Sequence, residues 1–318
     1  MSRGTAIVIP CYNHARYLGE AIESALAQTR AAAVITVVDD GSTEDVAAVA
    51  ARYPSVRYVR QRNGGTSAAR NTGLRTTRSE FLIFLDADDR LLPEAVELGE
   101  KRLRERPECA FAAGGTNTIA ADGSLLQPWR PYPAYEDPYA AMLVDHCFIY
   151  PVSTIYRRSA LEAANGFDVS FRRAEDWDID LRLAEHFPFV LHQQPVGERR
   201  RHGNNISGDA AGMLAAIIRV QRSRRVATRR NAAHEAARLR GMRRTRAVYS
   251  EQVVTRIHEL IDAGRWGAAI GLAATLLRSH PGILLERGAL KAALLRERWG
   301  GSAGEGGKAR PSSEPGGT

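Results

Sequence analysis

The stretch that most constrains this chain is 81–85, five consecutive apolar residues that run directly into Asp86, Asp88 and Asp89. A short apolar run bounded by charge on both sides is typical of a strand buried on both faces of a sheet. Carboxylates crowded at the end of such a strand repel one another, and each raises the pKa of its neighbours. A divalent cation removes that repulsion, and oxygen ligands suit Mg²⁺ or Mn²⁺. The strand end therefore predicts a site for a metal ion and for phosphate oxygens bound to it.

The first hundred residues alternate between apolar runs and amphipathic segments. We expect strands at 5–10, 34–38, 56–59 and 81–85, each followed by a helix, with Pro10 closing the first strand because proline cannot continue a central ladder. This rhythm predicts an α/β fold with a Rossmann-like, mostly parallel sheet flanked by helices. Ligands of such sheets bind beyond the carboxyl ends of the strands. Three of the four expected strands end in polar clusters, at residues 12–13, 39–40 and 86–89, which places the predicted site at that edge.

The pattern is less regular after residue 100. Residues 110–123 predict a hairpin that leaves the main sheet, and further elements are expected at 153–156 (strand), 159–164 (helix), 175–186 (helix) and 189–192 (strand). Residues 249–281 predict a helix pair broken near Ala263–Gly264. We therefore expect three parts: an α/β domain at 1–208, a basic α-helical extension at 209–299 and a disordered Gly/Ser/Pro-rich tail at 300–318.

Composition indicates in which kind of cellular compartment the protein works. The chain has 318 residues, of which 44% are hydrophobic, enough for a globular core. No run approaches the roughly 18 apolar residues of a membrane span, and the N-terminus lacks the features of a signal peptide. Three scattered cysteines, Cys11, Cys109 and Cys147, fit a reducing compartment. We expect a cytoplasmic protein, with peripheral binding to the inner face of the plasma membrane as an option.

The net charge of +8 is concentrated in one segment. Eleven arginines and one acid, Glu235, lie between Arg219 and Arg246, which we interpret as one basic helix. The simplest interpretation is a solvated basic face, and the alternative is contact with anionic membrane lipid or a polyanionic acceptor. Nucleic acid is not expected as a partner because the arginine run lacks aromatic residues.

Four motifs in the first ninety residues resemble those of the family 2 glycosyltransferases of the GT-A fold. They are AIVIPCYN at 6–13, VVDDGST at 37–43, GTSAARNTG at 65–73 and LDADD at 85–89. The resemblance continues more thinly through Glu175–Asp176 and Arg201–His202 to about Ser207. It implies an inverting, metal-dependent enzyme that moves a sugar from a nucleoside-diphosphate donor, most simply a UDP-sugar, to a hydroxyl acceptor. Products of this kind include cell-envelope polysaccharide, glycolipid and glycoconjugates.

The resemblance also implies roles for single residues at the metal. Asp88 would contact a Mg²⁺ or Mn²⁺ ion that bridges the donor diphosphate, and Asp86 would face the ribose or the metal. His202 lies in a motif whose histidine reaches the metal or the diphosphate, although a lone histidine is often only structural. Chemically, the ion would offset charge that develops on the departing nucleoside diphosphate.

Further positions are assigned to the nucleotide-sugar. By resemblance Asp39 would accept the N3 proton of uracil or thymine, and Tyr12 would stack on the base or else be an ordinary loop tyrosine. Arg70 suits a base or phosphate contact, with an exposed helix arginine as the alternative. The remaining positions in the same motifs are Pro10, Asn13 and Ala87.

The predicted general base is Asp176. The reaction needs a carboxylate to take a proton from the acceptor hydroxyl while that oxygen attacks the anomeric carbon. The family places this base in a motif like Glu175–Asp176 at a helix start. Acids in a first helical turn also favour the helix dipole, which explains Glu175 and Asp178 without any catalytic role.

Three other functions fit the residues less well than glycosyl transfer does. A sugar-1-phosphate nucleotidyltransferase needs a glycine-rich basic loop after the first strand, and residues 10–14 contain no glycine. A non-catalytic nucleotide-sugar-binding scaffold is disfavoured by the intact acids at the strand ends. The absence of a G-x-G-x-x-G motif after the first strand argues against a dinucleotide dehydrogenase.

Overall fold

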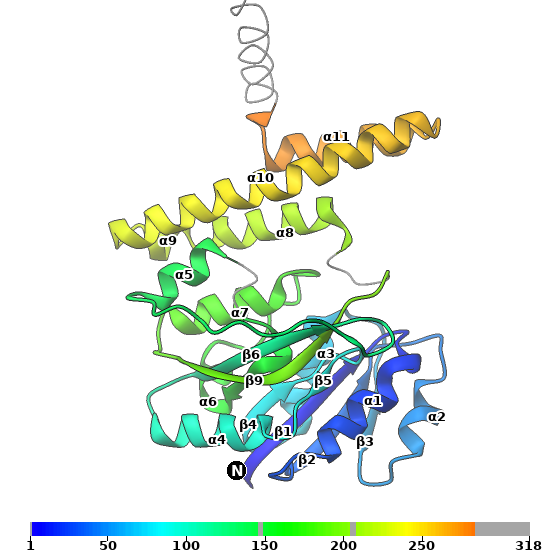
Figure 1. Ribbon diagram of the computed structural model, residues 1–318, viewed down its shortest axis with the longest axis vertical. Coiled ribbons are helices and arrows are strands. Elements are labelled where there is room, and N and C mark those ends of the chain that lie inside the picture. The colour runs from blue at the N-terminus through cyan, green and yellow to red at the C-terminus, as the bar shows by residue number, and fades with distance from the viewer. Residues whose placement is uncertain (1, 146–148, 204–207, 284–318) are drawn as a thin grey trace, which may run out of the picture.

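A computed structural model describes residues 2–145, 149–203 and 208–283 and shows a mixed α/β fold with a helical region at one end (Figure 1). The predicted tail at 300–318 and the third cysteine, Cys147, lie outside the described residues. No described helix is both long enough and apolar enough to cross a bilayer.

The N-terminal half forms the parallel part of the sheet. Its strands lie in the order β3-β2-β1-β4, and their bounds are Ser2–Cys11 (β1), Val34–Asp39 (β2), Arg57–Arg60 (β3) and Ser79–Phe84 (β4). The helices are Ala15–Leu26 (α1), Val46–Ala51 (α2), Thr66–Thr76 (α3) and Ala95–Glu105 (α4). The predicted alternation of strands and helices is thus confirmed.

The expectation that Pro10 closes the first strand is wrong by one residue. Pro10 pairs in register with Val38 of β2, and β1 ends at Cys11. On its other side, the pairing of β1 with β4 ends at Val8 and Phe84. Proline is tolerated here because only one neighbouring strand remains at this height of the sheet.

The second half of the sheet continues in the order β4-β8-β6-β9-β5, with β7 beside β6. Its bounds are Arg90–Leu91 (β5), Phe111–Ile119 (β6), Leu125–Gln127 (β7), Thr154–Arg157 (β8) and Val190–Arg200 (β9). Strand β8 is antiparallel to both of its neighbours, β4 and β6. The helices of this half are Pro138–Val144 (α5), Arg158–Ala163 (α6) and Glu175–Ala184 (α7), with a 3₁₀ turn at Pro151–Ser153.

The prediction that 110–123 leaves the main sheet is wrong. Strand β6 is an interior strand, in which Ala112 pairs with Ile155 of β8 and with Val190 of β9. A hairpin does follow, closed where the Ala120 N–H donates to the Ser124 carbonyl at 2.8 Å. The sequence of β6 has few large apolar residues, so it gives no sign that the strand is buried. The strand is buried by the elements packed around it.

Alternation along the central strands separates two cores. Ile7 and Ile9 face one side with α1 and α4, whereas Val8 faces the other side with α3, α6 and α7. On that second side a Cβ on Gly73 of α3 would collide with Val8, so the helix axis lies unusually close to β1. The second core continues into the helical region through Met213, which packs in the same cluster.

The helical region comprises Ala210–Ser223 (α8), Arg225–Thr228 (α9), Ala232–Asp262 (α10) and Trp266–Ser279 (α11). The predicted pair broken near Gly264 is confirmed, and this glycine has a left-handed φ of 70°. The single basic helix expected over 219–246 is wrong, because the chain turns twice before α10, which Asn231 caps. Figure 1 shows α8 and α10 lying over α5 and α7, at the end of the molecule opposite β2 and β3.

Several arginines of the basic segment attach this region to the rest of the protein. Arg224 pairs with Glu185 of the α/β part at 3.2 Å, and Arg244 pairs with Asp145 at 2.9 Å. The Gln221 side chain donates to the Leu143 carbonyl at 2.6 Å. Part of the arginine run is therefore structural and not a solvated face.

Candidate active site

Two histidines and one aspartate meet where three loops converge. The Nε2 atom of His202, just after β9, lies 2.9 Å from Oδ2 of Asp88, which follows β4. The Nδ1 atom of His14, in the loop after β1, lies 3.8 Å from the same oxygen. One ligand atom from each residue lies within 4.8 Å of the other two. A carboxylate with two imidazoles fits a divalent cation, so the donor set supports the predicted placement of Asp88 and His202.

Sequence reasoning missed His14. Its partners are 74 and 188 residues away in the chain, so no local spacing identifies it as a ligand. A usable signal was its place directly after the first strand, among the residues already assigned to the site.

Arg200 connects the loop of Asp88 to the end of β9 through hydrogen bonds. The buried side chain donates through Nε to the Asp88 carbonyl at 2.8 Å, and its backbone N–H donates to Asp89 Oδ1 at 2.8 Å. Its guanidinium also lies 4.9 Å from the centre of the Tyr17 ring, which stacks on His202 at 5.1 Å. Burial raises the pKa of Asp89 well above its usual range, and the charges of Asp88 and Asp86 raise it further.

Asp39 lies at the end of β2 with both carboxylate oxygens engaged. Oδ1 accepts from the Ser42 backbone N–H at 2.8 Å and Oδ2 from the Tyr58 hydroxyl at 2.6 Å. Burial raises the pKa of Asp39, but these hydrogen bonds and the nearby Arg60 outweigh burial and lower the pKa. The carboxylate therefore stays ionised. Tyr12 follows Cys11, the β1 residue that pairs with Asp39, and 49% of its surface is exposed.

Asn13 connects the loop after β1 to the loop after β2 by hydrogen bonds. Its φ of 54° is left-handed, its backbone N–H donates to Ser42 Oγ at 3.0 Å, and its side-chain oxygen accepts from the Thr43 N–H at 2.8 Å. The backbone N–H and side-chain oxygen of Asn13 are thus already engaged. The predicted contact of Asn13 with the nucleotide-sugar would have to use its other polar groups. Pro10 and Ala87 are buried, so neither side chain offers an exposed surface to a ligand.

Arg70 joins the acidic loop to α7. One guanidinium nitrogen contacts Asp86 Oδ1 at 2.8 Å and the other contacts Glu175 Oε1 at 3.0 Å. Only 2% of Arg70 is exposed. Two carboxylates therefore occupy the side chain that the sequence assigned to a base or phosphate, while Asp86 remains one-third exposed.

Helix α7 begins with three acids that differ in their surroundings. Glu175 is buried against Arg70, and buried Asp178 pairs with Arg182 at 2.8 Å. Asp176 is partly exposed, as a proton acceptor for an incoming hydroxyl must be. The next residue, Trp177, is core, because its indole N–H donates to the Met142 carbonyl at 3.0 Å.

Two buried carboxyls lie behind Asp176. Burial raises the pKa of Glu175 to about 7, with Arg70 opposing the rise and the charge of Asp176 adding to it. Burial raises the pKa of Asp180 to about 8, although the Tyr156 hydroxyl donates to it at 2.7 Å. Near neutral pH, the raised pKa values favour the protonated forms of both carboxyls just behind the exposed acid.

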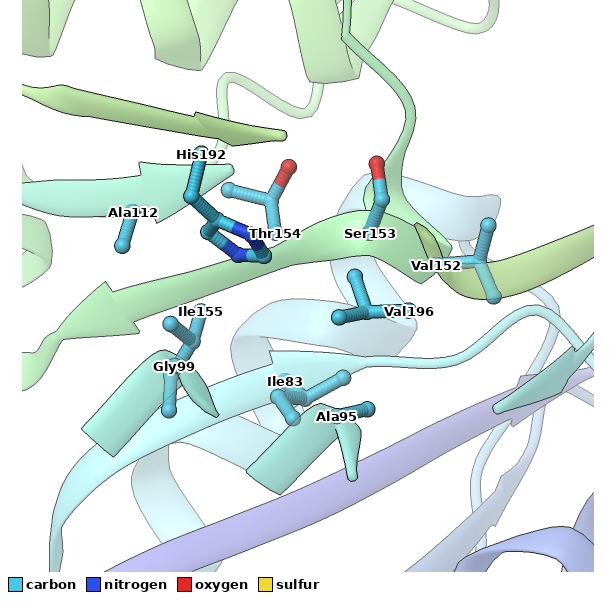
Figure 2. A pocket seen from close by; sticks show the side chains of 10 residues that line it. All are labelled: Ile83, Ala95, Gly99, Ala112, Val152, Ser153, Thr154, Ile155, His192 and Val196. Atoms are coloured by element: carbon cyan, nitrogen blue, oxygen red, sulfur yellow. The ribbon is translucent and has the colours of Figure 1, made fainter. Parts of the chain in front are cut away.

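Contacts connect most of the predicted residues into one site. Asp39 reaches Asn13 through Ser42, the adjacent His14 reaches Asp88, and Asp86 of the same loop reaches α7 through Arg70. A small cavity between α4 and the sheet is separate (Figure 2), and none of the predicted site residues lines it.

A Rossmann-like sheet whose strand ends bring acids and imidazoles together in this way defines a GT-A glycosyltransferase. The chain belongs to the glycosyl transferase family 2, whose family model matches residues 6–164. The predicted family, fold class and enzyme class are thereby confirmed.

The chain is also similar to individual known proteins and solved structures. The chain is 32% identical over 207 residues to a chondroitin synthase of Escherichia coli, covering 64% of this chain and 29% of that protein. The chain therefore spans less than a third of that relative. S. aureus TarS in complex with UDP-GlcNAc superimposes with a TM-score of 0.63, at 17% identity over 87% of this chain and 83% of that one. A mannosyltransferase from Pyrobaculum calidifontis in complex with GDP-Man and Mn²⁺ gives a TM-score of 0.55 at 14% identity, covering 87% and 88%.

Proposed function

We propose that this enzyme is a metal-dependent, inverting glycosyltransferase that moves a sugar from a UDP-sugar to a hydroxyl acceptor in polysaccharide or glycoconjugate synthesis. The observation that carries the proposal is the series of contacts and short chain connections that links Asp39, Asp88, Arg70 and the start of α7. The UDP-GlcNAc bound by TarS supports the choice of a uridine donor. The acceptor and linkage are left open, because acceptor pockets are built from variable loops.

Each group in the site has a task in this reaction. Asp39 accepts the N3–H of uracil, and Tyr12 covers the base. Asp88 and His202 hold a Mg²⁺ or Mn²⁺ ion, and a cation bound there offsets the charge of the leaving diphosphate. Asp176 takes the proton of the acceptor hydroxyl as its oxygen bonds to the anomeric carbon from the opposite face. The bond from that carbon to the diphosphate oxygen breaks with its electron pair, which inverts the configuration.

The test is a panel of nucleotide sugars screened by thermal shift and by hydrolysis, with and without Mn²⁺. We expect a UDP-sugar to give the largest stabilisation, and we expect Asp88→Asn to remove the metal-dependent part of it. A response to nucleoside triphosphates with release of pyrophosphate, and none to nucleotide sugars, would overturn the proposal.

We further propose that the helical region binds anionic lipid at the inner face of the plasma membrane, with 209–299 as the extension and 1–208 as the catalytic domain. Residues 209–283 carry fourteen arginines and five acids, whereas residues 1–208 carry 24 basic and 27 acidic residues. Exposed arginines on α9 and α10 stand beside exposed Val226 and Leu239. Each arginine near an anionic surface contributes about 1 kcal/mol, so a few are enough for salt-sensitive binding.

Sedimentation with vesicles tests this surface without truncating the chain, because α8 and α10 share a core with α7. We expect the full chain to pellet with vesicles rich in anionic lipid at low salt, and not with neutral vesicles. The triple variant R230Q/R240Q/R243Q should lose pelleting. Its matched control, R52Q/R57Q/R62Q, removes equal charge from exposed sites of the α/β part and should retain it. Equal pelleting of both variants would contradict the proposal.

A further inference from the structure

The His14 side chain has no capping role in the local structure of its own loop. His14 is the residue that precedes the first turn of α1, a position that favours Ser, Thr, Asp or Asn because their side chains accept the first helical N–H groups. Its ring makes no such capping bond, and the two N–H groups of Tyr17 and Leu18 bond instead to its backbone carbonyl at 3.1 Å each. The side chain is therefore available for another task.

That side chain points to the acid of the metal cluster. His14 Nδ1 and His202 Nε2 lie 3.8 Å and 2.9 Å from the same oxygen of Asp88. Two atoms each about 2.1 Å from one ion are about 3 Å apart in neighbouring positions and about 4 Å apart in opposite ones. The two separations from Asp88 Oδ2 are close to that interval, and all three atoms lie within 4.8 Å of one another, so a small adjustment of the side chains would let them bind one ion.

Packing fixes both rings in these positions. The Tyr17 ring stacks on His202 with an interplanar angle of 26°, and its centre lies 6.5 Å from that of His14 in an edge-on arrangement. The two imidazoles are themselves edge-on at 5.6 Å. Only 8% of the His202 side chain and 12% of that of Asp88 are exposed, whereas His14 keeps 29%. His14 therefore forms the solvent side of a preorganised cluster.

We propose that His14 is a third protein ligand, which with Asp88 and His202 makes a two-histidine, one-carboxylate site that prefers first-row transition ions such as Mn²⁺ or Co²⁺ to Mg²⁺. The proposal rests on the proposed function, which requires only Asp88 and His202. Two imidazoles among three ligands disfavour Mg²⁺, which prefers oxygen ligands, and favour softer divalent ions. With three protein ligands, the remaining coordination positions of a bound ion would be open to diphosphate oxygens.

The test measures metal binding by the full chain without nucleotide. We expect Mn²⁺ to bind more tightly than Mg²⁺ in calorimetric titrations, and pulsed electron paramagnetic resonance of bound Mn²⁺ to show nitrogen couplings from two imidazoles. His14→Phe, which keeps an aromatic ring against Tyr17, should leave one coupled imidazole and weaken Mn²⁺ binding roughly 10- to 100-fold or more. It should leave weak Mg²⁺ binding nearly unchanged. His258→Phe, at an exposed position of α10, is the control and should match the wild type.

The outcomes separate this inference from the proposed function. If His14→Phe binds Mn²⁺ as the wild type does while Asp88→Asn does not, His14 is no ligand and the Asp88–His202 site stands. If Asp88→Asn also binds normally, both are overturned. The coupling count on the wild-type protein is independent of any variant, so one coupled imidazole refutes the inference even if His14→Phe fails to fold.

Discussion

Arg70 and Glu175 form a buried ion pair, Nη1 to Oε1 at 3.0 Å, that ties the middle of α3 to the first residue of α7. The other end of the guanidinium holds Asp86 of the acidic loop at 2.8 Å. One side chain therefore fixes the distance between the loop that would carry the donor diphosphate and the turn that carries Asp176. We infer that Arg70 positions these two groups and does not contact the ligand.

Arg70→Lys should separate the two halves of the site while keeping the positive charge. Lysine cannot reach both carboxylates in the fixed geometry of the guanidinium fork. A shift of about 1 Å between reacting groups costs about 100-fold in kcat, so we expect a loss of that order with little change in the Kd of UDP. Arg75→Lys, exposed on the same helix, is the control. A weaker Kd with unchanged kcat would show that Arg70 binds the nucleotide.

Asp176→Asn tests the base directly. The amide is nearly isosteric but cannot accept the acceptor's proton, so we expect kcat to fall by about 10²- to 10⁴-fold. Stabilisation by UDP and Mn²⁺ should be unchanged, because Asp39 and Asp88 lie in other loops. Asp122→Asn, an exposed acid in the turn after β6, is the control and should keep full activity. Transfer by Asp176→Asn at the wild-type rate would remove Asp176 from the mechanism.

Local patterns predicted the parallel half of the fold and the gathering of acids at its strand ends. The strands at β1, β2 and β4 are continuous apolar runs, and the acids after β2 and β4 follow them directly, so strand-end convergence was predictable. The interior position of β6 was not, because its Ala and Gly residues carry no strand signal and its pairing depends on partners far along the chain. The ion pairs of Arg70 and the place of His14 in the site were not predictable for the same reason. Their partners come from other elements, at positions that local spacing does not reveal.

Asp39→Asn should weaken and broaden base recognition. The amide loses the ionised acceptor that the Tyr58 hydroxyl and the Ser42 N–H hold in place. A hydrogen bond to a charged group is worth about 1.5–3 kcal/mol, so UDP affinity should fall about 10- to 100-fold. Competition between UDP and CDP measures the effect, because cytosine has no N3–H to donate. An unchanged preference for UDP would place the base elsewhere.

His192 should make the fold sensitive to acid, independently of catalysis. Its ring points into the small cavity beneath α4 (Figure 2), where burial lowers the pKa to about 4 from an ordinary 6.5. The unfolded chain therefore binds this proton at a higher pH than the folded chain does. Stability from the neutral ring is full above about pH 6.5 and is lost as pH falls toward 4, by an amount on the order of 3 kcal/mol. Urea unfolding of His192→Gln at pH 7 and pH 5 should show a smaller loss between the two than the wild type shows. An equal loss in both proteins would mean that acids with lowered pKa values, such as Asp39, set the acid limit.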